Sequence, residues 1–262
     1  MTDNVVSCVS NYRKYLPTAE LEVRLGRYQG GKFTAGVERE VFDQLISDMQ
    51  SIPEFVDEGE WKEVVDYHFA HGNRKTRTRV LFNSDNMSMN TEHIHKYTVS
   101  ESTYGHVRDD EDIAFRVMTS QELPVVDALP VVCIPTHVRI KQRRCFEDVR
   151  NGVVAWKYEF SKTWSANSRS VVEQLQHMSP PVYEVECELV DMDGSYLHEN
   201  DDAFISKSLV LKGQMMCGDD VQDSTFEQIS HWTNTSIPVE STSKRTNRKR
   251  VASNTSRMEK AC

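Results

Sequence analysis

The sequence lacks the features of a membrane or secreted protein. No stretch approaches the roughly 18 consecutive apolar residues of a membrane span, and the polar start MTDNVVSCVSNYRKY contains no apolar signal core. The six cysteines are dispersed, with no CxxC pair and no spacing typical of a disulfide framework or a zinc site. We therefore expect an intracellular protein with reduced thiols and no membrane partner.

The chain also lacks internal repeats, and residues 15–217 contain no linker rich in proline or glycine, which predicts a single domain over residues 1–232. Residues 233–262 form a tail rich in Ser, Thr and Asn, with seven Lys and Arg against two acids. With so few large apolar side chains, we expect this tail to be disordered. Its basic run KRTNRKR (244–250) fits a nuclear import signal, a nucleic-acid arm or a solubilising tail, so the expected location is the nucleus or the cytoplasm.

Alternating apolar and polar residues dominate the rest of the chain. They predict strands at 18–25, 62–70, 75–83, 92–100, 113–123, 136–146, 153–162 and 182–191. Apolar residues at helical spacing predict helices at 37–50, 168–178 and 202–216. Many strands with a few covering helices favour a barrel or a strongly curved antiparallel sheet.

Two of the predicted strands carry glutamates on one face. Because neighbouring residues of a strand point to opposite faces, AELEVRLG places Glu20, Glu22 and Arg24 together, and YEVECEL places Glu184, Glu186 and Glu188 together. One such strand is ordinarily a solvated sheet face. Two of them repel each other if they are neighbours, unless cations lie between them.

Two further strands supply positive charge. HVRIKQRRCF places Arg139, Lys141 and Arg143 on one face, and AWKYEFSKTW places Lys157 and Glu159 on one face. The opposite faces are largely apolar, and the amphipathic helices need an apolar surface to cover. We therefore predict an α+β, mainly antiparallel protein: a closed eight-stranded β-barrel with charged residues inside and helices packed outside.

A lumen lined in this way suits a polyphosphate. Arg and Lys neutralise phosphate oxygens, whereas clustered carboxylates hold hard divalent cations such as Mg²⁺ or Mn²⁺. Histidine pairs at 68/71 and 93/95 favour packing roles over a metal site, because His68 and His71 point to opposite faces of a strand. We also expect Trp156 and Trp164 to cover the barrel rather than to stack on bases.

Six motifs in order resemble the metal-dependent RNA 5′-triphosphatases of fungi, protozoa and large DNA viruses, within the triphosphate tunnel metalloenzymes. They are ELEVRLG, KFTAGVEREVFDQL, DIAFRVMTSQELP, RIKQR, WKYEFSK and YEVECEL, and they extend from about Ala19 to Leu189. The resemblance implies hydrolysis of the γ-phosphate of 5′-triphosphate RNA to a 5′-diphosphate end, the first step of mRNA cap formation. It also implies Mg²⁺ or Mn²⁺ as cofactor and a guanylyltransferase as a candidate capping partner.

The resemblance also implies roles for individual residues. Glu20, Glu22 and Glu188 would bind the metal, and Glu122 or Glu186 would position the attacking water. The phosphate-binding set would be Arg77 or Arg79, Lys96, Arg139, Lys141, Arg143 and Lys157. Arg24, Glu159 and Glu184 would support them, and Lys157 and Glu159 stand where the family usually has Arg and Asp.

Two other functions fit the same charged lumen. An inorganic tripolyphosphatase, nucleoside triphosphatase or nucleotide cyclase of the same fold would use the same phosphate contacts. A barrel that only binds an anionic ligand would need no metal and would release no phosphate. Comparing triphosphate RNA, tripolyphosphate and ATP as substrates distinguishes these functions.

Overall fold

The computed structural model describes residues 3–53, 55–71, 74–83, 88–105, 113–125, 134–150, 153–190 and 195–218. The chain divides into two units, Met1–Val221 and Gln222–Cys262, and the second lies outside the described residues. The domain boundary expected at residue 232, the tail 233–262 and its basic run 244–250 therefore also lie outside them.

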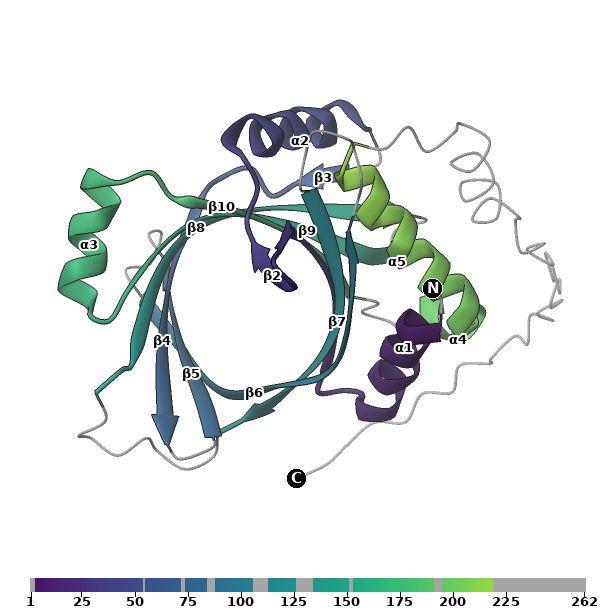
Figure 1. Ribbon diagram of the computed structural model, residues 1–262, viewed down its shortest axis with the longest axis horizontal. Coiled ribbons are helices and arrows are strands. Elements are labelled where there is room, and N and C mark those ends of the chain that lie inside the picture. Colours follow the sequence, from purple (N-terminus) through teal and green to yellow (C-terminus); the bar gives the residue numbers. More distant parts are fainter. Residues whose placement is uncertain are drawn as a thin grey trace, which may run out of the picture. The chain divides into compact units, whose positions relative to one another are not determined.

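Eight strands close into an antiparallel barrel, which confirms the predicted fold class (Figure 1). Around the ring they are β1 (Ala19–Gln29), β7 (Ile113–Pro124), β6 (Ser88–Gly105), β5 (Arg74–Asn83), β4 (Lys62–His71), β8 (His137–Arg150), β9 (Val153–Ala166) and β10 (Val182–Leu189). Pairing of β10 with β1 closes the ring. Two short strands lie off it: β2 (Lys32–Ala35) pairs with β1, and β3 (Phe55–Asp57) pairs with β8.

The apolar side chains of the strands point out of the barrel. On β1, Leu21, Val23 and Leu25 are fully buried, although they lie on the face opposite Glu20 and Glu22. They belong to a core that also contains buried residues of the helices, so the main hydrophobic core lies between the barrel and its outer helices. The alternation of the sequence therefore divides each of these strands into a packing face and a lumen face.

Five helices surround the barrel within the described residues: α1 (Asp3–Tyr15), α2 (Arg39–Ser51), α3 (Arg169–Met178), α4 (Ser195–Glu199) and α5 (Asp202–Met216). The last begins where the Asp201 carboxylate accepts a hydrogen bond from the Phe204 backbone N–H, 2.8 Å away. The predictions at 37–50, 168–178 and 202–216 are confirmed to within a few residues, whereas α1, α4, β2 and β3 were not predicted. No helix in the described ranges is long and apolar enough to span a membrane.

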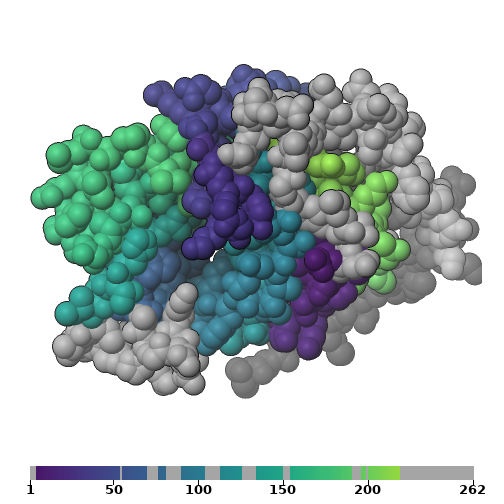
Figure 2. Space-filling view, viewed as in Figure 1, coloured from purple at the N-terminus to yellow at the C-terminus, as the bar shows by residue number. Residues whose placement is uncertain are grey.

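A hairpin of β1 and β2 projects at one end of the barrel. Through Arg24, β1 pairs with β10, but from Gly26 onward its partner on that side is β2. In Figure 1 this hairpin lies across the end of the barrel that faces the viewer, and in Figure 2 its dark purple atoms lie over part of that end. The chain then returns to the barrel through an isolated bridge between Val37 and Tyr183.

Candidate active site

The glutamates of β1 and β10 face each other where the barrel closes. The register places Glu22 opposite Glu188 and Arg24 opposite Glu186. Glu22 is buried, with 4% of its surface exposed. The two strands that the sequence singled out for their acidic faces are therefore neighbours, and their carboxylates share one wall of the lumen.

Arg24 lies between two of these carboxylates. Its guanidinium is 3.0 Å from Glu22 and 2.8 Å from Glu186. Burial opposes ionisation of Glu186, but Arg24 and Lys141 hold its pKa well below the usual range. Arg24, expected as a supporting residue, thus neutralises charge from both acidic strands.

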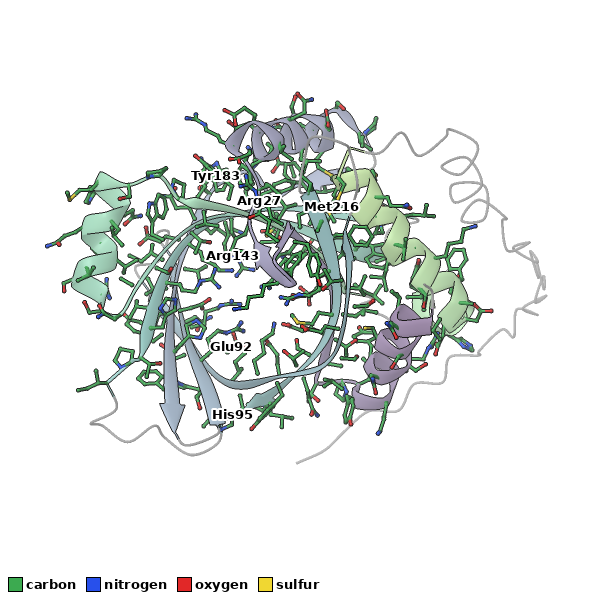
Figure 3. All side chains as sticks on the ribbon, in the orientation of Figure 1. Arg27, Glu92, His95, Arg143, Tyr183 and Met216 are labelled. Atoms are coloured by element: carbon green, nitrogen blue, oxygen red, sulfur yellow. The ribbon has the colours of Figure 1, made fainter. Side chains whose placement is uncertain are left out.

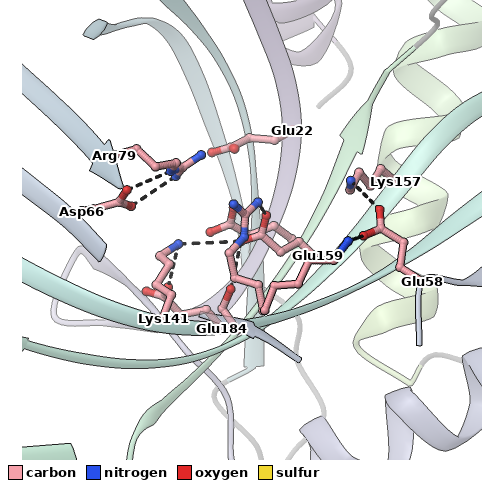
Figure 4. A network of polar contacts seen from close by, with 12 residues as sticks. Glu22, Glu58, Asp66, Arg79, Lys141, Lys157, Glu159 and Glu184 are labelled. Atoms are coloured by element: carbon pink, nitrogen blue, oxygen red, sulfur yellow. Dashed lines mark hydrogen bonds and ion pairs between the residues drawn. The ribbon is translucent and has the colours of Figure 1, made fainter. Parts of the chain in front are cut away.

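The basic residues of β8 lie beyond β9 from the glutamates of β10, and each of them contacts a carboxylate. Figure 4 shows Lys141 beside Glu184 in this network. Arg139 lies 2.5 Å from Glu184, and Arg143 pairs with Glu159. The buried Lys141 ammonium lies 3.5 Å from Glu184 and 3.8 Å from Glu159. Burial lowers the pKa of Lys141, although nearby glutamates oppose that change. Glu159 and Glu184 therefore fix the position of the basic side chains.

A second basic group comes from β5 and β6. Lys96 pairs with Glu20 and lies 3.2 Å from Glu122, and Arg77 lies 3.1 Å from Glu122. Ser120 donates a hydrogen bond of 3.3 Å to Glu20. The proposed water-positioning residue Glu122 is therefore held by two cations near the end of β7, beside the start of β1.

Asp66 is a lumen residue that sequence reasoning missed. It is 2% exposed and accepts two hydrogen bonds from Arg79, at 2.8 and 3.1 Å. Burial opposes ionisation, but Arg79 holds the pKa of Asp66 at about 2. Of the two acids in KEVVDYHF only Asp66 lies on the lumen face, which gave a weak signal, whereas the register of β4 and β5 places Asp66 directly opposite Arg79.

Lys157 lies apart from the other predicted phosphate ligands. Its ammonium is 2.9 Å from Glu58, a residue that follows β3 and also contacts Lys62 at 2.7 Å. On β9 it stands opposite Glu188 and two residues before Glu159. Sequence reasoning placed Lys157 in the lumen but did not foresee its partner, which comes from a segment about 100 residues earlier.

Glu188 differs from the other glutamates of β1 and β10, each of which pairs with a Lys or Arg. Among the described residues, none forms a hydrogen bond or ion pair with the Glu188 carboxylate. Burial, together with the charges of Glu20 and Glu22, raises its pKa to about 8. The carboxyl groups at this seam thus outnumber the Lys and Arg side chains that pair with them.

These carboxylates fit a hard divalent cation by their chemistry. Oxygen ligands suit Mg²⁺ and Mn²⁺, and an uncompensated carboxylate beside Glu22 provides a place for positive charge. The described side chains do not form a closed cage of three or more protein ligands, since Glu20 is turned to Lys96. Mg²⁺ commonly takes only one or two carboxylates and completes its shell with water and phosphate oxygens.

A cavity of about 570 Å³ lies at the end of the barrel where β1 begins. Its lining consists of His93, apolar or small residues, and four glutamates: Glu20, Glu92, Glu122 and Glu188. No Lys or Arg is among the described residues that line it. Lys96 and Arg77 pair with Glu20 and Glu122 from behind this lining, so the acidic excess at this end comes from Glu92 and Glu188.

The histidines and tryptophans outside the lumen have packing partners. Figure 3 shows Arg143 and Glu92 inside the ring of strands and His95 outside it. His93 and His95 each share a hydrogen bond of 2.9 Å with a threonine of β5. Trp156 and Trp164 are buried, as expected for residues that cover the barrel.

Comparison with known proteins supports the fold. No protein-family model matches the sequence, and no curated protein matches it. The solved structure of the S. pombe Pct1 RNA triphosphatase is similar, with a TM-score of 0.53 and 16% identity over 80% of this chain and 89% of that chain. The Mimivirus capping enzyme triphosphatase in its triclinic form gives a TM-score of 0.51 and 15% identity, over 83% of this chain and 97% of that chain. The chain therefore has the barrel fold of these RNA triphosphatases.

Proposed function

We propose that this protein is a metal-dependent RNA 5′-triphosphatase that removes the γ-phosphate of 5′-triphosphate RNA and leaves a 5′-diphosphate end. The observation that carries the proposal is the lumen itself, where an undercompensated carboxylate seam lies beside a wall of Arg and Lys. The structural likeness to RNA triphosphatases of a fungus and a giant virus supports the same reaction.

The proposed metal ligands are Glu20, Glu22 and Glu188, and the proposed cofactor is Mg²⁺ or Mn²⁺. When bound there, the cation would polarise the γ-phosphate and neutralise its oxygens. Because Glu188 has no basic partner among the described residues, its carboxylate is available to a cation without breaking an ion pair.

The basic residues would bind the phosphates and stabilise the charge that develops on them during in-line displacement. They are Arg77, Arg79, Lys96, Arg139, Lys141, Arg143 and Lys157. Most already pair with lumen carboxylates, so they are held in place before substrate arrives, which reduces the reorganisation that the reaction requires. Arg24, Glu159 and Glu184 are the proposed supporting residues.

Glu122 or Glu186 would hold the attacking water and accept its proton. Both carboxylates contact lumen cations, Glu122 through Arg77 and Lys96, and Glu186 through Arg24. Arg24 and Lys141 lower the pKa of Glu186 and keep it in the ionised form, which is the form that accepts a proton. The reaction needs no covalent nucleophile.

Residues 1–232 would form the catalytic domain and residues 233–262 a separate basic tail. A protein of this function would act where RNA is capped, in the nucleus or the cytoplasm, and would pass its product to a guanylyltransferase. The S. pombe protein has been solved in complex with the Spt5 CTD, so this fold also accommodates a protein partner.

The alternative is an inorganic tripolyphosphatase or nucleoside triphosphatase with the same lumen. The decisive experiment measures phosphate release from γ-labelled triphosphate RNA, tripolyphosphate and ATP with Mg²⁺ or Mn²⁺. We expect RNA to be hydrolysed and Glu22→Ala and Glu188→Ala each to lower turnover at least about a hundredfold. Near-normal turnover in either variant would reject the metal assignment, and hydrolysis of tripolyphosphate alone would favour the alternative.

A further inference from the structure

The lumen face of β1 continues beyond the barrel into the β1–β2 hairpin. Residues two apart on a strand share a face, so Glu20, Glu22, Arg24, Gly26 and Tyr28 form one row. The side chains along this row are first acidic (Glu20 and Glu22), then basic (Arg24), and finally aromatic (Tyr28). Tyr28 lies about 20 Å along the strand from Glu22, at 3.4 Å per residue.

Two aromatic residues, Tyr28 of β1 and Phe33 of β2, lie at the end of this row. They are register partners in the hairpin, so their side chains lie on the same face of the two strands. Tyr28 is 46% exposed, and no described residue forms a hydrogen bond or ring contact with it. An isolated exposed aromatic side chain is ordinary on a protein surface. This one is unusual because it extends the lumen face at the mouth of the barrel.

Positive charge lies immediately below the aromatic pair. The Arg116 guanidinium is 4.6 Å from the centre of the Phe33 ring, and Arg116 stands opposite Arg24 in the register of β1 and β7. Gly26 makes this arrangement possible, because a Cβ atom at that position would lie 2.6 Å from the Phe33 ring. The hairpin thus holds its aromatic face beside two arginines that lead into the lumen.

The two ends of the barrel differ in charge. At the end where β1 begins, the 570 Å³ cavity is lined by four glutamates, of which Lys96 and Arg77 neutralise only Glu20 and Glu122, so this end retains excess negative charge. At the hairpin end, Arg116 lies against the Phe33 ring, and Arg24 precedes Gly26 and Tyr28 in the same row. A polyphosphate attached to a nucleotide is therefore favoured to enter from the hairpin end, with its terminal phosphate toward Glu22 and Glu188.

We propose that Tyr28, supported by Phe33 on the β1–β2 hairpin, stacks on a base near the 5′ end of single-stranded RNA while the triphosphate occupies the lumen. This inference rests on the proposed function, and it identifies Tyr28 as a residue that favours RNA over tripolyphosphate as substrate. Every base has a π-face, so such a contact recognises RNA without reading its sequence. Tripolyphosphate has no base and gains nothing from the hairpin.

The test compares two substrates in one set of variants. Steady-state phosphate release is measured from a 5′-triphosphate oligoribonucleotide and from tripolyphosphate for the wild type, Tyr28→Ala and Tyr28→Trp. Tyr97→Ala is the matched control, because Tyr97 is also exposed (37%) but points out of the barrel from β6. We expect Tyr28→Ala to lower kcat/KM for RNA about tenfold and for tripolyphosphate less than about twofold. Tyr28→Trp and Tyr97→Ala should behave as the wild type.

Equal losses on both substrates, or no loss on RNA, would overturn the stacking proposal and leave the proposed function intact. If the wild type releases phosphate from neither substrate, the proposed function is wrong. In that case the stacking proposal is tested by measuring RNA binding. Anisotropy of a 3′-labelled triphosphate RNA, measured in EDTA, should show about tenfold weaker binding to Tyr28→Ala than to Tyr97→Ala. Equal binding by the two variants would refute stacking.

Discussion

Glu22 on β1 lies directly opposite Glu188 on β10, so the seam that closes the barrel places two carboxylates side by side. Backbone hydrogen bonds hold the strands together while these side chains repel each other. Arg24 relieves part of this repulsion at Glu22 but does not pair with Glu188. Repulsion at the seam therefore lowers the folding stability of the metal-free protein, and it does so at the proposed metal site.

Removing that charge should stabilise the metal-free protein above about pH 8, where Glu188 is ionised. We expect Glu188→Gln to raise Tm by about 2–4 °C in EDTA, which corresponds to relief of about 1 kcal/mol of repulsion. Added Mn²⁺ should raise the Tm of the wild type and leave that of Glu188→Gln nearly unchanged, because a cation stabilises only the state that binds it. Differential scanning fluorimetry with and without Mn²⁺ measures both effects.

Glu63→Gln is the matched control for this prediction, since Glu63 is an exposed strand residue. Its Tm should be that of the wild type in EDTA and should rise with Mn²⁺ as the wild type does. A lower Tm for Glu188→Gln in EDTA would contradict the inferred repulsion.

Glu159 should act by positioning Arg143 and Lys141. We expect Glu159→Gln to lower kcat/KM about tenfold or more, because misplacing a phosphate-binding group by about 1 Å can cost up to a hundredfold. If Glu159 works through Arg143, Glu159→Gln and Arg143→Lys combined should lose much less than the product of the single losses. Glu173→Gln, which removes an exposed ion pair with Arg169 on α3, should leave kcat/KM unchanged. Multiplicative losses in the double variant would show that the two residues act independently.

The buried pair of Asp66 and Arg79 should be coupled in stability. Asp66→Ala leaves the guanidinium of Arg79 without its partner, and we expect the free energy of unfolding to fall by about 3 kcal/mol. The double variant Asp66→Ala/Arg79→Met should lose less than the two single variants together, since it leaves no unpaired charge. Urea denaturation at pH 7.5 gives all three values. Additive losses would mean that the two side chains do not stabilise each other.

Substitution of Gly213 on α5 tests the packing between the barrel and its outer helices. Helix propensity alone predicts that alanine at this position of α5 would stabilise by about 1 kcal/mol. A Cβ atom there would lie 2.4 Å from the Phe115 ring, however, and overpacking typically costs about 1–3 kcal/mol. We expect Gly213→Ala to lower the urea midpoint, with triphosphatase activity per folded molecule unchanged. A higher midpoint would show that Phe115 moves aside freely.

Alternation along the strands made much of the barrel predictable from the sequence. It identified the lumen face of β1, β8, β9 and β10, because a period of two assigns each residue to one side once the strand is recognised. The pairing of β1 with β10 that closes the barrel was harder to predict from the sequence. These strands are separated by more than 150 residues, and no local pattern specifies their register. The resemblance to the tunnel enzymes, rather than periodicity, gave the residue roles, and these stay predictions.

The missed elements have identifiable causes. In α1, Val5, Cys8, Val9 and Tyr12 recur at helical spacing and are buried, but they are sparse among polar residues. Strands of three or four residues, such as β2 and β3, offer too few positions for a period to be recognised. Asp66 was missed because its partner Arg79 is identified only by strand register, and Glu58 because it follows such a short strand.

The placement of the apolar core outside the barrel has a consequence for how this chain tolerates change. Side chains alternate along each barrel strand. One side chain packs in the core between the strand and the helices, and the next lies in the lumen, where its charge is compensated by neighbouring side chains. A saturation mutagenesis profile should therefore alternate along β1 between sensitivity of abundance and sensitivity of turnover. Catalytic specificity could then change through lumen positions while the packing that keeps the protein folded is left untouched.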